Sequence, residues 1–73
     1  MFEISIIIDP ENLHITNSIG KFSEFTMFAQ VLRIVESFQS LGFTIEKDEE
    51  RLFCYWVLNT NKDAVFYIET NKF

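Results

Sequence analysis

Residues 23–41 carry the longest uninterrupted pattern in the chain, and its period is helical. The segment contains no Gly or Pro, and polar residues recur at a 4-3-4-3 spacing, at Thr26, Gln30, Arg33, Ser37 and Ser40. This spacing places the polar side chains in one stripe along an α-helix. Ser23 is a favourable N-cap, and Gly42 is a favourable residue just past the C-terminal end. The pattern predicts one long helix over about residues 23–41.

The remainder of this helix is almost entirely apolar. Its apolar side chains are Phe25, Met27, Phe28, Val31, Leu32, Ile34, Val35, Phe38 and Leu41. They cover an arc of roughly 200°, whereas a helix packed on one layer needs an apolar stripe of about 100°. We therefore expect one sheet face to leave part of the helix uncovered. Either residues 9–22 or a second subunit would cover the remainder.

Alternation of apolar and polar residues predicts strands on both sides of the helix. Residues 2–8 alternate, and residues 13–16 alternate again after a turn at residues 9–12, whereas residues 17–21 have the composition of a loop. After the helix, strands are predicted over residues 43–45, 51–58 and 64–70, with turns at residues 46–50 and 59–63. The order is ββαβββ. We predict a two-layer α+β sandwich, with one long helix on a mostly antiparallel sheet, in a single domain over residues 1–73.

The last two predicted strands are apolar on both faces, although a sheet covered by one helix should be polar on its other face. We assign Cys54, Trp56, Phe66 and Ile68 to the helix side. This choice leaves Phe53, Tyr55, Val57, Val65 and Tyr67 on the outer face. They predict an exposed apolar patch larger than a monomer normally shows, and hence a binding surface. The alternative is that loops or termini cover both sides of these strands.

The turn at residues 46–50 is acidic, since Glu46, Asp48, Glu49 and Glu50 accompany a single lysine. Such a turn is usually a solvated surface, but it can also attract a partner protein with a basic surface. The whole chain has eleven acidic and six basic residues and a formal net charge of −5. This balance disfavours direct binding to nucleic acid, because Lys and Arg must neutralise the phosphates.

No pattern in the chain predicts catalysis, a metal site or a cofactor. His14 is the only histidine, and no nucleophile and orienting acid accompany it. Cys54 is the only cysteine, which excludes an internal disulfide and favours a reducing compartment. No apolar run approaches the 18 or so residues of a membrane span. We expect a non-enzymatic cytoplasmic protein that does not bind membranes, in a bacterium or a phage-infected cell.

Two functional hypotheses follow from these features. The first is a small binding protein that inhibits or regulates another macromolecule through the outer sheet face and the acidic turn. Phage anti-defence inhibitors such as anti-CRISPR proteins, antitoxins and toxin-immunity proteins are often small, acidic and free of motifs in this way. The alternative is a homodimerisation module or an accessory subunit, which would pair through the aromatic face or a free sheet edge. A small enzyme is disfavoured, because so short a chain seldom encloses a ligand pocket.

Overall fold

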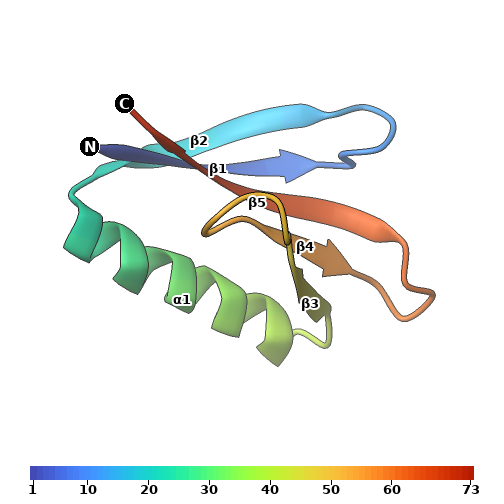
Figure 1. Ribbon diagram of the computed structural model, residues 1–73. Coiled ribbons are helices and arrows are strands. Elements are labelled where there is room, and N and C mark those ends of the chain that lie inside the picture. Colours follow the sequence, from blue (N-terminus) through green and yellow to red (C-terminus); the bar gives the residue numbers. More distant parts are fainter.

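Five antiparallel strands form one sheet, and a single helix packs on one of its faces (Figure 1). The computed structural model describes residues 1–73. Its elements are β1 (Phe2–Ile8), β2 (Ile15–Phe22), α1 (Glu24–Ser40), β3 (Thr44–Lys47), β4 (Tyr55–Leu58) and β5 (Ala64–Lys72). The strands lie in the order β2-β1-β5-β4-β3. The predicted two-layer α+β fold with ββαβββ order is therefore confirmed.

The first and last strands pair with each other at the middle of the sheet. β1 and β5 are antiparallel over their whole common length, from Phe2 opposite Lys72 to Ile8 opposite Phe66. Beyond the strands, the backbone N–H of Phe73 donates a 2.9 Å hydrogen bond to the carbonyl of Met1. The two ends of the chain therefore lie side by side (Figure 1).

The helix begins and ends where the sequence predicts. The Ser23 side chain accepts a hydrogen bond from the Thr26 backbone N–H, which identifies Ser23 as the N-cap. At the other end, Gly42 has a φ of +96°. Gly42 N–H donates to the Gln39 carbonyl and Phe43 N–H to the Phe38 carbonyl, and the Phe38 and Phe43 rings meet edge to face at 5.7 Å. These contacts are those of a Schellman motif, in which glycine relieves the strain of a positive φ.

The core between helix and sheet is built from five fully or almost fully buried side chains, which are Ile4, Met27, Val31, Val57 and Ile68. Phe38, Phe43 and Phe66 pack around one another at the end of this core, with ring centroids 5.1–5.9 Å apart. Burial of large aromatic side chains contributes strongly to the stability of a small domain.

Several strand boundaries differ from the prediction. β3 continues through Glu46 to Lys47, both predicted in the acidic turn, and β5 ends at Lys72 instead of residue 70. Residues 17–21, predicted as a loop, belong to the long edge strand β2, which pairs with β1 through a bulge near Gly20. Hydrogen bonding to β1 overrides the weak strand preference of Asn, Ser and Gly. The strand predicted over residues 51–58 begins only at Tyr55. Phe53 has a φ of +61°, and such a residue cannot continue an extended strand.

The faces predicted for β4 are wrong, and those predicted for Phe66, Ile68 and Tyr67 of β5 are correct. Side chains directly opposite each other in an antiparallel pair share a face. Val57 lies opposite Phe66 and Tyr55 opposite Ile68, whereas Trp56 lies opposite Tyr67. Consequently Tyr55 and Val57 lie on the helix side, and Phe53 also packs against the main core.

Cys54 and Trp56, predicted on the helix side, belong instead to a separate cluster with Tyr67. Val65 lies beside a bulge in the β4–β5 pairing, is half-buried and belongs to neither apolar cluster.

Candidate functional site

The outer face of the sheet carries a small second cluster instead of an open aromatic patch. Ile7, Cys54 and Tyr67 are buried there, and Trp56 is half-buried against them. The Trp56 and Tyr67 ring centroids are 4.4 Å apart. The predicted large exposed patch on this face is therefore wrong, because three of the five residues assigned to it face the helix and Tyr67 is buried.

The segment of residues 48–54, between β3 and β4, is tied to β5 by side-chain contacts on this face. The Arg51 guanidinium donates to Glu69 at 2.9 Å and to Asn71 at 2.7 Å. The Tyr67 hydroxyl donates to the Asp48 carboxylate at 2.6 Å. This segment therefore covers part of the outer face of the last strands, in agreement with one of the two sequence interpretations. Of the acidic turn, Asp48 is bonded within the chain, whereas Glu49 and Glu50 are exposed.

Cys54 completes the hydrogen bonding of β5 at a point that β4 does not reach. The Thr70 backbone N–H lies 3.4 Å from the Cys54 sulfur, and the thiol lies 3.7 Å from the Thr70 carbonyl. A thiol is a weak donor and a weak acceptor, so one side chain bonds both backbone groups of Thr70. Cys54 is therefore a structural residue, as expected for a fully buried thiol.

The contact between Tyr67 and Asp48 shifts the pKa of both groups. The hydrogen bond from Tyr67 lowers the pKa of Asp48, and the backbone N–H of Glu50 lowers it further. Burial is the main cause that raises the pKa of Tyr67, and the hydrogen bond to the Asp48 carboxylate raises it further. Both shifts favour the pair in which Asp48 is ionised and Tyr67 is neutral.

The Tyr67–Asp48 pair predicts a pH-dependent contribution to stability. Because the pKa of Asp48 is lowered in the folded state, its contribution is present above the unfolded value of 3.8 and is lost as the pH falls through the folded value. Because the pKa of Tyr67 is raised, its contribution is present below the unfolded value of 10.0 and decreases as the pH rises above it. Urea unfolding of the wild type and of Tyr67→Phe should therefore differ most at neutral pH. The difference should shrink at both extremes.

Tyr55→Phe is the matched control for this measurement, since Tyr55 is half-buried on the helix side and its hydroxyl is not part of the pair. Its effect on the free energy of unfolding should not follow the same two pH windows. A difference between the wild type and Tyr67→Phe that stays constant from acid to alkaline pH would contradict the assigned contact.

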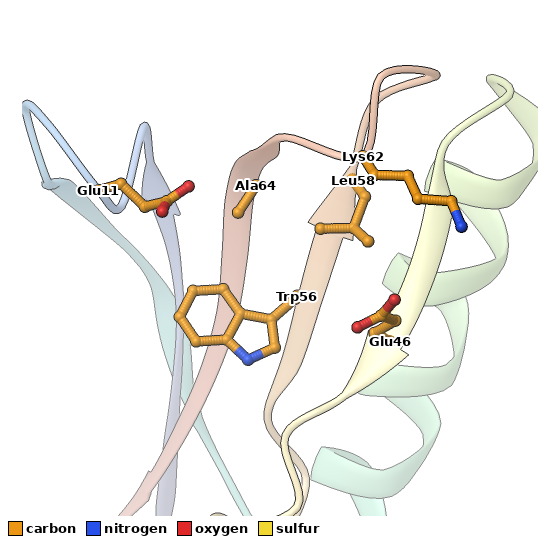
Figure 2. Close-up of a pocket in the computed structure, with 6 residues that line it drawn as sticks. All are labelled: Glu11, Glu46, Trp56, Leu58, Lys62 and Ala64. Carbon is orange, nitrogen blue, oxygen red and sulfur yellow. The ribbon is translucent and has the colours of Figure 1, made fainter.

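An open hollow of about 350 Å³ lies on the outer face beside Trp56 (Figure 2). Its lining residues are Glu11, Glu46, Trp56, Leu58, Lys62 and Ala64. Glu46 of β3 lies directly opposite Trp56 of β4. Glu11 comes from the β1–β2 turn and Lys62 from the β4–β5 turn. The volume is at the lower end of the range for ligand sites in proteins.

Of the predicted partner-binding residues, the structure brings only Glu46 into this hollow. The sequence prediction places Trp56 on the helix side, which is wrong, and it places Glu11 in the turn at residues 9–12. Lys62 lies in a turn that the sequence predicts, but nothing in the sequence connects that turn with Glu11. The acidic character of residues 46–50 is the only sequence signal that points to a residue of the hollow, Glu46.

The helix leaves apolar side chains exposed on one flank, as its predicted width requires. Phe25 is 85% exposed, Phe28 44% and Leu32 57%. The Phe28 ring meets the Phe53 ring edge to face at 4.8 Å, and the adjacent residue Leu52 is 72% exposed. We call Phe25, Phe28, Leu32 and Leu52 the helix flank. An apolar groove of about 200 Å³ runs beside it, lined by Phe28, Val31, Leu32, Val35, Phe53 and Tyr55.

Comparisons of the chain with protein-family models, with curated proteins and with solved structures found no match. The single helix lacks the length and apolarity needed to cross a lipid bilayer. Two surfaces of the molecule are candidates for binding, the hollow beside Trp56 and the helix flank.

Proposed function

We propose that the chain is a binding protein that inhibits or regulates another protein inside the cell, and that it holds a basic region of this partner against the outer sheet face. The observation that supports this proposal is the hollow, where the half-buried Trp56 lies between two carboxylates that form no salt bridge. Tryptophan is enriched among the residues that contribute most to protein–protein affinity.

The charge distribution agrees with a basic partner. Glu11 and Glu46 line the hollow, and Glu49 and Glu50 extend the acidic surface beyond the end of β3. The salt bridge of the chain joins Arg51 to Glu69 and leaves these four carboxylates free. Unpaired surface acids accelerate the association of an oppositely charged partner, and the acceleration decreases as salt is added.

The size and charge of the chain support an inhibitory role. A small acidic protein that covers a basic surface can block access of a larger substrate to that surface. Nucleases and nucleic-acid-binding enzymes present such surfaces, because their Lys and Arg residues neutralise phosphates. Phage anti-defence inhibitors, antitoxins and immunity proteins are often small, acidic and free of motifs, as this chain is. We propose this class of partner, without assigning one member of it.

Affinity purification from the native host, followed by reconstitution, tests the proposal. The tagged wild type is compared with the double variant Glu11→Gln/Glu46→Gln and with a control, Glu24→Gln/Glu36→Gln, which removes two exposed acids of the helix. A partner that is retained by the wild type and the control, lost with the first variant, and altered in its own activity by the purified chain supports the proposal. Equal retention by all three proteins, or a purified pair that does not associate, contradicts it.

Self-association through the helix flank is a second candidate function. The four side chains of the helix flank are apolar, and two of them, Phe25 and Leu52, are 85% and 72% exposed. An isologous contact uses the same patch on both copies, and the flank supplies large apolar side chains for it. A basic partner would instead be attracted to the acidic outer face. We therefore propose a second copy of this chain as the occupant of the helix flank.

Phe25→Ser is expected to weaken self-association and to leave the fold intact. Because each substitution occurs twice in an isologous contact, the dimer dissociation constant should rise roughly thirtyfold or more. Light scattering across a concentration series measures the change. Leu13→Ser is the control, since Leu13 is 70% exposed but lies on the β1–β2 turn. A wild type that remains monomeric at high micromolar concentration would contradict this candidate function.

A further inference from the structure

We propose that the hollow beside Trp56 is a receptor for one arginine side chain. The identity of the molecule that presents this arginine rests on the proposed function, whereas the binding of an arginine side chain can be tested without a partner. The inference follows from three properties of the hollow: an aromatic wall, two unpaired carboxylates and an apolar floor.

The aromatic wall is Trp56. One side of its ring contacts Tyr67, with centroids 4.4 Å apart, and the ring also lines the hollow. A cation placed over the face of an aromatic ring is attracted by the negative potential of that face, and tryptophan gives the strongest attraction. Because Trp56 is held by its contact with Tyr67 and by the pairing of β4, its ring is oriented before a ligand arrives.

The two carboxylates lie on opposite sides of the indole (Figure 2). Glu46 lies directly across from Trp56 on the neighbouring strand, and Glu11 extends from the β1–β2 turn. The chain supplies no salt-bridge partner to either of them. A positive charge placed over the ring would therefore lie between two negative charges, an arrangement that favours a cationic ligand over a neutral one.

Arginine fits these groups better than lysine. A guanidinium is planar, stacks on an aromatic ring and offers several N–H donors at its edge, whereas an ammonium is a compact, strongly hydrated charge. A guanidinium stacked on Trp56 directs its edge donors toward carboxylates beside the ring. Leu58 and Ala64 supply an apolar floor for the methylene groups of the same side chain.

Lys62 is the basic residue at the rim of the hollow, and it would compete with the ligand. It forms no salt bridge with Glu11 or Glu46, and its backbone has a φ of +64°. Among residues with a side chain, asparagine and aspartate tolerate this left-handed conformation best. Lys62→Asn therefore removes the competing charge and preserves the turn. It should tighten binding of a cation by up to about fivefold, the effect of one exposed charge pair.

The test titrates N-acetyl-arginine amide into the protein at constant ionic strength and follows tryptophan fluorescence. Trp56 is the only tryptophan, so the signal reports on the hollow directly. N-acetyl-citrulline amide, which has nearly the same shape without the charge, is the neutral control. We expect a saturable change with arginine, with a dissociation constant on the order of millimolar. Citrulline should give no saturable change.

Matched variants separate the hollow from general acidity. Loss of two exposed charge pairs in Glu11→Gln/Glu46→Gln should weaken arginine binding roughly two- to thirtyfold. Glu49→Gln/Glu50→Gln removes the same number of charges from the neighbouring turn and should have little effect. Equal binding of arginine and citrulline amides, equal effects of the two double variants, or lysine amide binding at least as tightly as arginine would each overturn the proposal.

The two proposals can fail separately. If arginine amide binds as described but no partner is found, the hollow stands and the proposed function fails. If a partner is captured and reconstituted but its binding is unchanged by 50 mM arginine amide, a concentration well above the expected dissociation constant (on the order of millimolar), the hollow is not the contact.

Discussion

Val57→Asp is expected to abolish cooperative folding. Val57 has no exposed surface and lies in the core with Met27 and Ile68. An unpaired carboxylate at that position costs several kcal/mol, whether it stays ionised or takes up a proton. A chain of this size has a total stability of roughly 4–11 kcal/mol. The variant should show neither a cooperative urea transition nor the dispersed amide spectrum of a folded protein.

Thr44→Asp is the control for this experiment. Thr44 is exposed on β3, next to the strand that contains Val57, and a surface substitution usually changes stability by less than about 0.5 kcal/mol. The comparison discriminates between the two possible orientations of β4, because the alternation of the sequence alone assigns Val57 to the outer face. A Val57→Asp variant that unfolds cooperatively near the wild-type midpoint would restore that first assignment.

Cys54→Ala is expected to destabilise the protein by about 2–4 kcal/mol. The thiol bonds both the N–H and the C=O of Thr70, and alanine leaves these buried groups without partners. Removal of the sulfur also opens a small cavity in a fully buried site. The free energy of unfolding from urea titrations measures the loss.

Cys54→Ser separates the hydrogen bonds from the packing. Serine keeps a donor and an acceptor at this position, although its hydroxyl reaches less far than the thiol. We expect Cys54→Ser to recover part of the stability that Cys54→Ala loses. Equal destabilisation by the two variants would mean that the sulfur matters for its volume alone. Reaction of the thiol with a chromogenic disulfide reagent should in addition be slow until the chain unfolds, because Cys54 is fully buried.

The sequence predicts the helix and the layer order well because both depend on local signals. Ser23, Gly42 and the polar stripe each act within a few residues, and the structure confirms all three. The width of the apolar arc also predicts correctly that the sheet leaves part of the helix exposed, as Phe25 shows.

The sequence does not predict which side chains of β4 face the helix, because a run without polar residues contains no signal that distinguishes one face from the other. The faces are decided by pairing with β5 and by the positive φ of Phe53, which interrupts the alternation. Neither is visible in the sequence. The hollow depends on tertiary structure still more strongly, because its six residues come from five separate elements and turns.

The pairing of β1 with β5 also determines when this protein can fold during its synthesis. β1 leaves the ribosome before the other elements of this domain, but its neighbour in the centre of the sheet, β5, leaves after all of them. Until β5 has emerged, β1 has only β2 beside it, and a two-stranded hairpin is marginally stable at best in water. The nascent chain therefore cannot bury Ile4, Ile6 and the apolar side of the helix in their final core until β5 has emerged. A cell that makes this protein completes its fold, and with it the hollow, only after β5 has been translated.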